Sequence, residues 1–352
     1  MDFLRFLQTE FLHLIMKKIF SIFILILFFS CNKHGQHAHG FYFWKSKLSL
    51  KDSEKNILEK STVTNLYVRF FDVDKIGDKF QPVGVISKSE NFSSSKLIVP
   101  VIFITNRTFL YIKDSEVDFL AKSIHELIVR KTKELNFRDI SEIQIDCDWT
   151  AGTKDDYFKF LEKLKGLSHK EITSTLRLHQ VKDKRKMGIP PVSKVYLMCY
   201  STSSPLENSD KNSILDIQIL KNYLSDVQDY PIKKIDIALP IYSWGIVTNH
   251  LGKHKLINAL SAKDLNHKDL EKISNNEAVV KKDGFFFGYY LNKGFKIKVE
   301  QIPEKTLDEA VVFLNHKIPK FNIIYYDRAK SKIYKKSFHF IKNYFIVHTS
   351  SC

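Results

Sequence analysis

The sequence predicts an α/β protein with one large domain, a closed (β/α)8 barrel. Apolar strand-like runs alternate with amphipathic helical stretches through most of the 352 residues. Polar and apolar residues alternate within the strands, as expected where one strand face lines a barrel and the other meets helices. The sequence contains neither an internal repeat nor a long linker. We therefore expect a single TIM-like barrel, with an open, doubly wound sheet as the alternative.

The N-terminus has the layout of a secretory signal peptide. From Met16 the chain reads Met-Lys-Lys, followed by an apolar or small-residue run over 19–30 and then Cys31. A basic start, a short apolar core and a small residue before the cleavage point are typical of such signals. The run is shorter than the about 20 apolar residues of a membrane span. We expect residues 1–30 to be removed, with Met16 as an alternative start.

The end of this signal resembles a bacterial lipoprotein signal, in which the cysteine becomes the lipid-modified first residue. The matching segment is Leu-Phe-Phe-Ser-Cys, ending at Cys31. The resemblance implies that a lipid on Cys31 anchors the mature protein in the bacterial cell envelope, at the outer membrane or the cell surface. Ordinary secretion is the alternative. We expect residues 31–62 to form a tether and lead-in, and residues 63–352 to form the barrel domain.

The composition narrows the classes of partner. Lys and Arg (55) exceed Asp and Glu (39) by 16, and removal of residues 1–30 leaves a net charge of +15. The basic residues are scattered among acidic ones, so we expect no nucleic-acid partner. His34, His37 and His39 cluster in the tether, where a polar spacer is favoured over a metal site. Four cysteines are too few for a disulfide-built scaffold.

The barrel elements follow in order along the chain. Ser115 with Asp118, and Thr153 with Asp156, have the spacing typical of helix starts. The stretch 245–300 fits the alternation poorly and predicts an inserted hairpin with strands at 285–291 and 295–300. The predicted strands are 65–73, 97–105, 141–149, 171–180, 194–200, 235–244 and 321–326, and the predicted helices are 115–135, 155–167, 213–227 and 307–316.

Strand parity predicts which side chains face the barrel interior. In the third predicted strand Ile143, Ile145 and Cys147 share one face, and Asp146 and Asp148 share the other. A parallel strand buried on both faces would be nearly all apolar. The polar face is therefore expected inside the barrel, with its charges near the C-terminal ends of the strands, where barrel enzymes place their sites.

Standard nucleotide, hydrolase and metal motifs are absent from the sequence. It has no G-x-G-x-x-G, no P-loop, no G-x-S-x-G and no C-x-x-C. His125-Glu126 begins like a zinc-protease helix, but Val129 stands where the second histidine is needed. We expect no cofactor and no metal.

The candidate site is a set of polar and aromatic residues at strand ends. Asp146 and Asp148 are the candidate catalytic pair, because carboxylates move protons in glycosidic cleavage and aromatic rings stack on sugars. An ion pair of these acids with Arg177 or Arg69 is the structural alternative. Asp72 and Asp74 are expected to be turn residues. The candidate substrate-binding residues are Arg177, His179, Tyr200, Tyr242 and Trp244.

At these positions the chain resembles glycoside-hydrolase-like TIM-barrel proteins, most of all a group of uncharacterised bacterial lipoproteins. That group has a Q-x-D-x-D-W/A strand followed by an M-x-Y strand. The matching residues are Gln144, Asp146, Asp148, Trp149, Met198 and Tyr200. Family eighteen chitinases have a similar D-x-x-D-x-D-x-E strand. Here Ile143 replaces the first Asp of that pattern, and Thr150 replaces the Glu that acts as general acid.

Two functions follow as hypotheses. The first is a cell-envelope lipoprotein whose barrel binds carbohydrate or acts as a glycoside hydrolase. The alternative is a non-catalytic envelope lipoprotein for protein interaction or assembly, since fold alone does not fix function. Cys147 and Cys199 are expected to be free thiols facing the helices, because one strand separates theirs and that spacing exceeds the reach of a disulfide.

Overall fold

A computed structural model describes residues 37–89, 92–207 and 210–327. The predicted signal peptide, Cys31, His34 and Cys352 lie outside these residues. The described chain from His37 onward belongs to one compact unit. Within the described part no helix is long and apolar enough to cross a membrane.

Eight parallel strands form a closed barrel. Adjacent strands pair in parallel, and β1 closes the ring by pairing with both β3 and β18, at Phe41 with Leu66 and at His39 with Ile323. This confirms the predicted barrel over the open sheet. The strands are β1 (His39–Phe43), β3 (Asn65–Ile76), β6 (Leu97–Ile104), β7 (Glu142–Cys147), β8 (Glu171–Leu176), β9 (Lys194–Met198), β10 (Lys234–Pro240) and β18 (Ile323–Tyr326).

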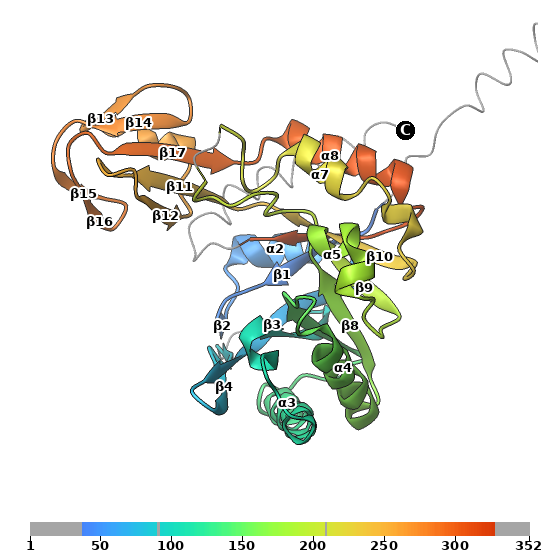
Figure 1. Cartoon of the computed structure of the whole chain (residues 1–352). Helices are drawn as coiled ribbons and strands as arrows, with labels where there is room; N and C mark the ends of the chain where they lie inside the picture. Colours follow the sequence, from blue (N-terminus) through green and yellow to red (C-terminus); the bar gives the residue numbers. More distant parts are fainter. Residues whose placement is uncertain (1–36, 90–91, 208–209, 328–352) are drawn as a thin grey trace, which may run out of the picture. The chain divides into compact units, whose positions relative to one another are not determined.

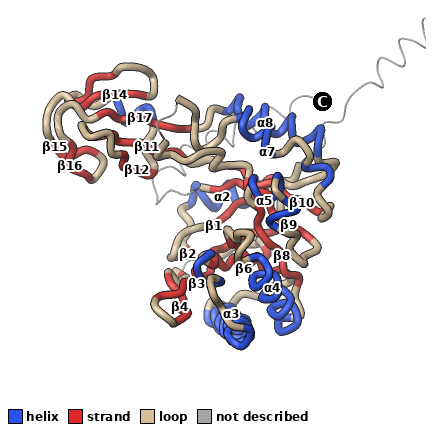
Figure 2. The backbone as a smooth tube through the Cα atoms, in the orientation of Figure 1, coloured by secondary structure: helices blue, strands red, loops and turns tan. Residues whose placement is uncertain are grey.

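Helices cover the outside of this ring. On α3 the residues Val117, Leu120, Ala121, Ile124 and Ile128 are buried, with the spacing of one helix face. Figure 2 shows α3 and α4 in blue, lying beside each other. The helices are α2 (Asp52–Lys60), α3 (Asp114–Glu134), α4 (Lys154–Ser168), α5 (Leu178–Lys182), α6 (Lys184–Met187), α7 (Ile217–Tyr223) and α8 (Glu304–Lys317), with 3-10 turns η1 (Asn106–Phe109), η2 (Val227–Asp229) and η3 (Ala262–Leu265).

The barrel begins earlier than the sequence predicts. Strand β1 and helix α2 both lie inside 31–62, the stretch expected to be a tether and lead-in. In β1, Phe41 and Phe43 join the layer beneath the helices, and Tyr42 points into the barrel core. His37 stacks on Phe321 with ring centroids 4.1 Å apart. The structure therefore assigns the stretch from His37 onward to the barrel itself.

Two strands end four residues before the predicted boundary. The strand predicted over 171–180 stops at Leu176, because the Gln180 side chain accepts a hydrogen bond from the Arg177 backbone N–H (2.7 Å) and starts α5. The strand predicted over 235–244 is two strands, β10 and β11 (Ser243–Thr248). The helix predicted over 213–227 is shorter, because α7 begins at Ile217, after an Asp216 side chain that caps it.

An antiparallel sheet is inserted between β10 and α8. Figure 1 shows its strands together, from gold-brown (β11 and β12) to orange (β13 to β17). The predicted pairing of 285–291 with 295–300 is wrong: β15 and β16 pair with each other, and β17 pairs with β11 and β14. The strands of the insertion are β11, β12 (His254–Asn258), β13 (Leu270–Lys272), β14 (Glu277–Val280), β15 (Gly284–Phe286), β16 (Tyr289–Leu291) and β17 (Lys296–Gln301).

Three short strands complete the sheets. Strand β4 (Lys79–Val83) extends the barrel sheet antiparallel to β3, and β2 (Lys47–Leu48) pairs with β5 (Ser87–Lys88).

A buried polar network fills the N-terminal end of the barrel. The Tyr196 hydroxyl donates to the Glu142 carboxylate (2.6 Å) and lies 2.9 Å from the Tyr67 hydroxyl. The Lys194 ammonium lies 2.9 Å from the Asp236 carboxylate and 4.0 Å from that of Glu142. Burial raises the pKa of Tyr67 to about 12. Each buried charge in this network therefore has an opposite charge or a hydrogen-bond donor beside it.

Cys147 and Cys199 are free and buried, as predicted. Both belong to the apolar layer between barrel and helices, and β8 separates their strands. Burial raises the pKa of both thiols well above the ordinary range. They are therefore neutral and structural.

Candidate functional site

The predicted alternation along β7 is confirmed. Ile143, Ile145 and Cys147 pack in the layer beneath the helices. Gln144 and Asp146, of the opposite parity, are also buried, and Asp146 is only 6% exposed. Asp146 therefore lies at the C-terminal end of β7 on the interior face, beneath the barrel mouth. Asp148 follows two residues later, after the strand has ended.

Asp146 is a buried acid beside a second acid. Its carboxylate accepts a hydrogen bond from the Thr175 hydroxyl on β8 (2.8 Å). Burial first, and the charge of Asp148 second, raise the pKa of Asp146 to about 7. The pair therefore holds a proton near neutral pH, with Asp146 as its carrier.

Asp148 is the exposed member of the pair. Its side chain is 47% exposed, and the Arg177 Nε lies 3.5 Å from its carboxylate. Arg177 caps α5, and the Gln180 amide donates to the Trp149 carbonyl (3.0 Å). These contacts fix the segment after β7 against the one after β8. The predicted alternative, an ion pair with Arg177, is present at Asp148, but it is long and open to solvent.

His179 lies on α5 rather than on a strand. Burial, and then the charge of Arg177, lower the pKa of His179. Within the described residues it makes no hydrogen bond or ion pair with Asp146 or Asp148. The neutral imidazole is therefore beside the acid pair but is not joined to it.

Tyrosine rings fill the barrel beneath the mouth. Tyr200, after β9, stacks on Tyr326 at the end of β18, with ring centroids 5.3 Å apart and an interplanar angle of 8°. Tyr242 packs edge-on against both, at 6.2 Å from Tyr200 and 5.8 Å from Tyr326. Tyr200 and Tyr242 are 5% and 3% exposed. The structure therefore brings these two predicted residues together, but in the buried layer beneath the mouth and not on an open surface.

The candidate Trp244 and the motif residue Trp149 are both buried. Trp244 is 2% exposed, and its indole N–H donates to the Glu300 carboxylate (2.9 Å) in β17. Trp149 is fully buried in the helix layer, and its indole donates to the Met187 carbonyl (3.0 Å). Neither ring is available to stack on a ligand in this structure. Trp244 instead ties the inserted sheet to the barrel core.

Two half-buried aromatic residues at the mouth were not predicted. Trp44 follows β1, and its ring centroid lies 5.5 Å from that of Tyr326. Tyr326 closes the last barrel strand. Alternation in the run Phe41 to Trp44 places Tyr42 and Trp44 on one face, which is the sequence pattern that identifies this strand.

Asp72 and Asp74 lie within β3, not in the predicted turn, and an arginine binds each of them. Asp72 accepts from the Arg69 Nε (2.6 Å), and Asp74 accepts from the Arg107 Nε (2.6 Å). The hydrogen bonds from Arg107 lower the pKa of Asp74 to about 2. Asp74 is therefore ionised, and both acids form structural ion pairs with arginines.

Thr150 has no acidic function where the chitinase pattern has a glutamate. It is exposed, its backbone N–H donates to the Thr153 hydroxyl (3.0 Å), and the two hydroxyls lie 3.2 Å apart. A threonine hydroxyl cannot serve as a general acid near neutral pH.

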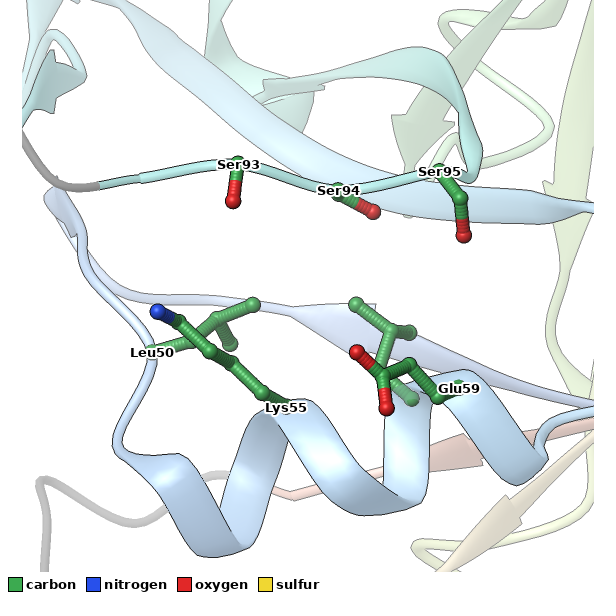
Figure 3. A pocket seen from close by; sticks show the side chains of 7 residues that line it. Leu50, Lys55, Glu59, Ser93, Ser94 and Ser95 are labelled. Carbon is green, nitrogen blue, oxygen red and sulfur yellow. The ribbon is translucent and has the colours of Figure 1, made fainter.

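A separate pocket of about 180 Å³ lies outside the barrel ring, between α2 and the segment before β6. Figure 3 shows Lys55 and Glu59 on one side of it and Ser93, Ser94 and Ser95 on the other. None of the predicted site residues lines this pocket. In the described ranges no group of three or more His, Cys, Asp or Glu side chains is placed to hold a metal ion.

Comparison with known proteins relates the chain to other barrels. No family model and no curated protein matches the sequence. The spore cortex-lytic enzyme SleL of Bacillus cereus has a TM-score of 0.54 at 14% identity, over 87% of this chain and 74% of that one. SleL of Bacillus megaterium QM B1551 has a TM-score of 0.51 at 14% identity, over 83% and 71% of the two chains. The chitinase Chi1 of the Yersinia entomophaga toxin complex has a TM-score of 0.51 at 12% identity, over 88% and 86%. The fold is thus the closed eight-stranded barrel of chitinase-like glycoside hydrolases.

Proposed function

We propose that this protein binds a glycan at its barrel mouth, as a lipid-anchored protein of the bacterial cell envelope. The observation that carries the proposal is the Asp146–Asp148 pair beside Arg177, at the C-terminal ends of β7 and β8. Barrels of this class place their sites at that end. The fold shared with cortex-lytic enzymes and chitinases supports a carbohydrate as ligand.

The exposed groups at the mouth suit a sugar. The half-exposed Asp148 carboxylate can accept hydrogen bonds from hydroxyl groups, and the neighbouring Arg177 can donate them. The half-buried rings of Trp44 and Tyr326 offer apolar surface for the C–H face of a pyranose. Tyr200 and Tyr242 support this surface from below.

The same geometry argues for binding rather than chitinase-type cleavage. Cleavage needs a proton donor that reaches the glycosidic oxygen. Thr150 cannot supply one, and Asp146 is 6% exposed with its carboxylate turned to Thr175. We therefore infer a glycan-binding barrel that retains an acid pair but lacks a placed general acid.

The test is a glycan array probed with the chain from Asn32, with reducing-sugar release measured in parallel. Asp148→Asn keeps the side-chain shape and removes the charge, so we expect affinity to fall by about 10- to 100-fold, the value of a hydrogen bond to a charged group. Asp155→Asn is the matched control, because Asp155 is 83% exposed on α4. Wild-type failure to bind any glycan, or equal affinity of the two variants, would contradict the proposal. Sugar release that depends on Asp148 would instead make the protein a hydrolase.

The anchor is tested separately. Cys31→Ser removes the site of lipid attachment, so we expect the protein to move from the membrane to the soluble fraction. Mass spectrometry of the wild-type N-terminal peptide should show an acylated Cys31. An unmodified peptide would refute the anchor and leave the glycan site untouched.

A second candidate function, protein interaction, has one observation in its favour. Phe285 and Tyr290 on the β15–β16 hairpin are 79% and 55% exposed, with ring centroids 5.3 Å apart. Exposed aromatic pairs are common at protein interfaces. A Phe285→Ser, Tyr290→Ser variant that loses an envelope partner but still binds glycan would show that the two functions use different surfaces.

A further inference from the structure

Basic side chains surround the N-terminal end of the barrel. They lie in, or directly beside, the turns that lead into β3, β7, β8, β10 and β18. We call the exposed ones the basic rim: Lys60, Arg138, Lys170, Lys233, Lys234 and Lys320. Because all barrel strands are parallel, these turns meet at one end of the barrel. The rim therefore concentrates charge opposite the mouth.

The charges of the rim are largely uncompensated. Within the described residues no rim side chain forms an ion pair, and only the Lys233 ammonium donates to a backbone carbonyl, that of Gln228 (3.0 Å). The exposed acids in the connections that lead into these strands are Glu59, Asp139, Glu171, Asp226 and Asp229. Half-buried Lys96 and Lys317 lie at the same end and donate to backbone carbonyls, so eight basic and five acidic residues leave a net +3. Glu171 is also engaged by the Ser193 hydroxyl (2.8 Å).

The predicted lipid tether reaches this same end. His37 is fixed there, because its Nδ1 lies 2.9 Å from the Phe321 carbonyl and the Ile323 N–H donates to the Ala38 carbonyl (2.9 Å). Five residues separate Cys31 from His37, and the six residue-to-residue steps span about 20 Å at most. A lipid on Cys31 would thus hold the basic rim close to the lipid headgroups.

We propose that the basic rim docks on anionic phospholipid headgroups, so that the barrel mouth faces away from the membrane. The proposal rests on the lipid anchor proposed above. Polybasic surfaces near a membrane are attracted by its negative potential, and the attraction fades within the Debye length. The short tether keeps the rim inside that range. The mouth, with Asp146 and Asp148, lies at the opposite end of the barrel.

The experiment measures vesicle binding without the lipid anchor. The chain from Cys31 to Cys352, carrying Cys31→Ser, keeps every described residue. We expect it to sediment with vesicles of equal parts phosphatidylglycerol and phosphatidylcholine but not with phosphatidylcholine alone, and to be released by salt. Lys170→Glu, Lys234→Glu and Lys320→Glu together should lower the partition coefficient by about tenfold or more.

The matched control is Lys281→Glu, Lys282→Glu and Lys293→Glu. It changes the net charge equally, but in exposed residues of the inserted sheet, and should bind vesicles at least tenfold more tightly than the rim variant. Lys→Gln changes at the same rim positions provide a milder set if the reversals unfold the protein. Equal loss in rim and control variants, or no preference for anionic vesicles, would overturn the docking. Either result leaves the lipid anchor standing, because that is tested by fractionation of the Cys31→Ser variant.

Discussion

The two ends of this barrel differ in how their buried charges are neutralised. At the N-terminal end Lys194 lies 2.9 Å from Asp236, and Glu142 accepts hydrogen bonds from Tyr196 and Thr173. At the mouth, Asp146 is buried beside a second acid, and its one described hydrogen bond comes from a neutral threonine. The first arrangement stabilises the barrel. The second is costly for folding and is typical of a functional site.

The largest expected effect is a pH dependence that originates at the mouth. The pKa of Asp146 is about 7 in the folded protein against an ordinary 3.8. Between these values the folded state holds a proton that the unfolded state has released, so this contribution to stability is complete below about pH 4 and is lost as pH rises through 7. We expect the free energy of unfolding of the wild type, measured in urea, to fall by about 4 kcal/mol relative to that of Asp146→Asn as the pH rises from about 4 to about 7. Parallel pH profiles for the two proteins would show that Asp146 ionises normally.

The next largest effect is a loss of stability at the N-terminal end of the barrel. Lys194→Met leaves Asp236 and Glu142 without their shared cation, so we expect the free energy of unfolding to fall by about 3 kcal/mol. Lys234→Met is the control, because Lys234 is exposed on the adjacent strand and should change stability by less than about 0.5 kcal/mol. A loss below about 1 kcal/mol in Lys194→Met would mean that the network does not stabilise the barrel.

A smaller effect is expected where the inserted sheet meets the barrel. Trp244→Phe removes one donor from the buried Glu300 carboxylate, which keeps the Ser213 backbone N–H (3.1 Å) and the Lys298 ammonium (3.0 Å). We expect thermal unfolding to report a loss of about 1.5–2 kcal/mol. Trp44→Phe should cost less, since Trp44 donates no hydrogen bond within the described chain. Equal losses of stability in the two variants would show that the smaller ring, and not the lost hydrogen bond, causes the effect.

The smallest effect on stability is expected at Asp148. Its pair with Arg177 is long and half exposed, so Asp148→Asn should change the free energy of unfolding by less than about 0.5 kcal/mol at neutral pH. The same substitution removes a like charge from Asp146, so the pKa of Asp146 should fall toward its ordinary value. Carbonyl NMR titration of Asp146 in both proteins measures this shift. An unchanged pKa would show that burial alone sets it.

Much of the barrel could be predicted from the sequence, because strands such as β6 and β7 are apolar on the face beneath the helices. Strand β1 could not, since its five residues follow a polar histidine-rich stretch and one of its two partners is β18, the last strand of the barrel. The break between β10 and β11 has no turn residue other than Pro240, so the apolar run 235–244 looks continuous.

The acid pair was predictable from parity, but the aromatic surroundings were not. Side-chain alternation places Asp146 inside the barrel, whatever the neighbouring strands contribute. Whether a ring such as Trp244 is open or buried depends on Glu300, which lies 56 residues away and follows an insertion whose pairing the local pattern does not encode. Trp44 was missed for the same reason as β1.

Closure of the ring by β1 and β18 also determines when the protein can fold. These strands pair across a separation of 284 residues, His39 with Ile323, so the barrel has two open edges until almost the whole chain is available. Folds dominated by such distant pairings form slowly, because the chain between the paired strands loses entropy before the stabilising contacts form. A chain exported as proposed above would therefore cross the membrane before its barrel could close. Unpaired β1 and β10 edges are the surfaces that need protection during that interval.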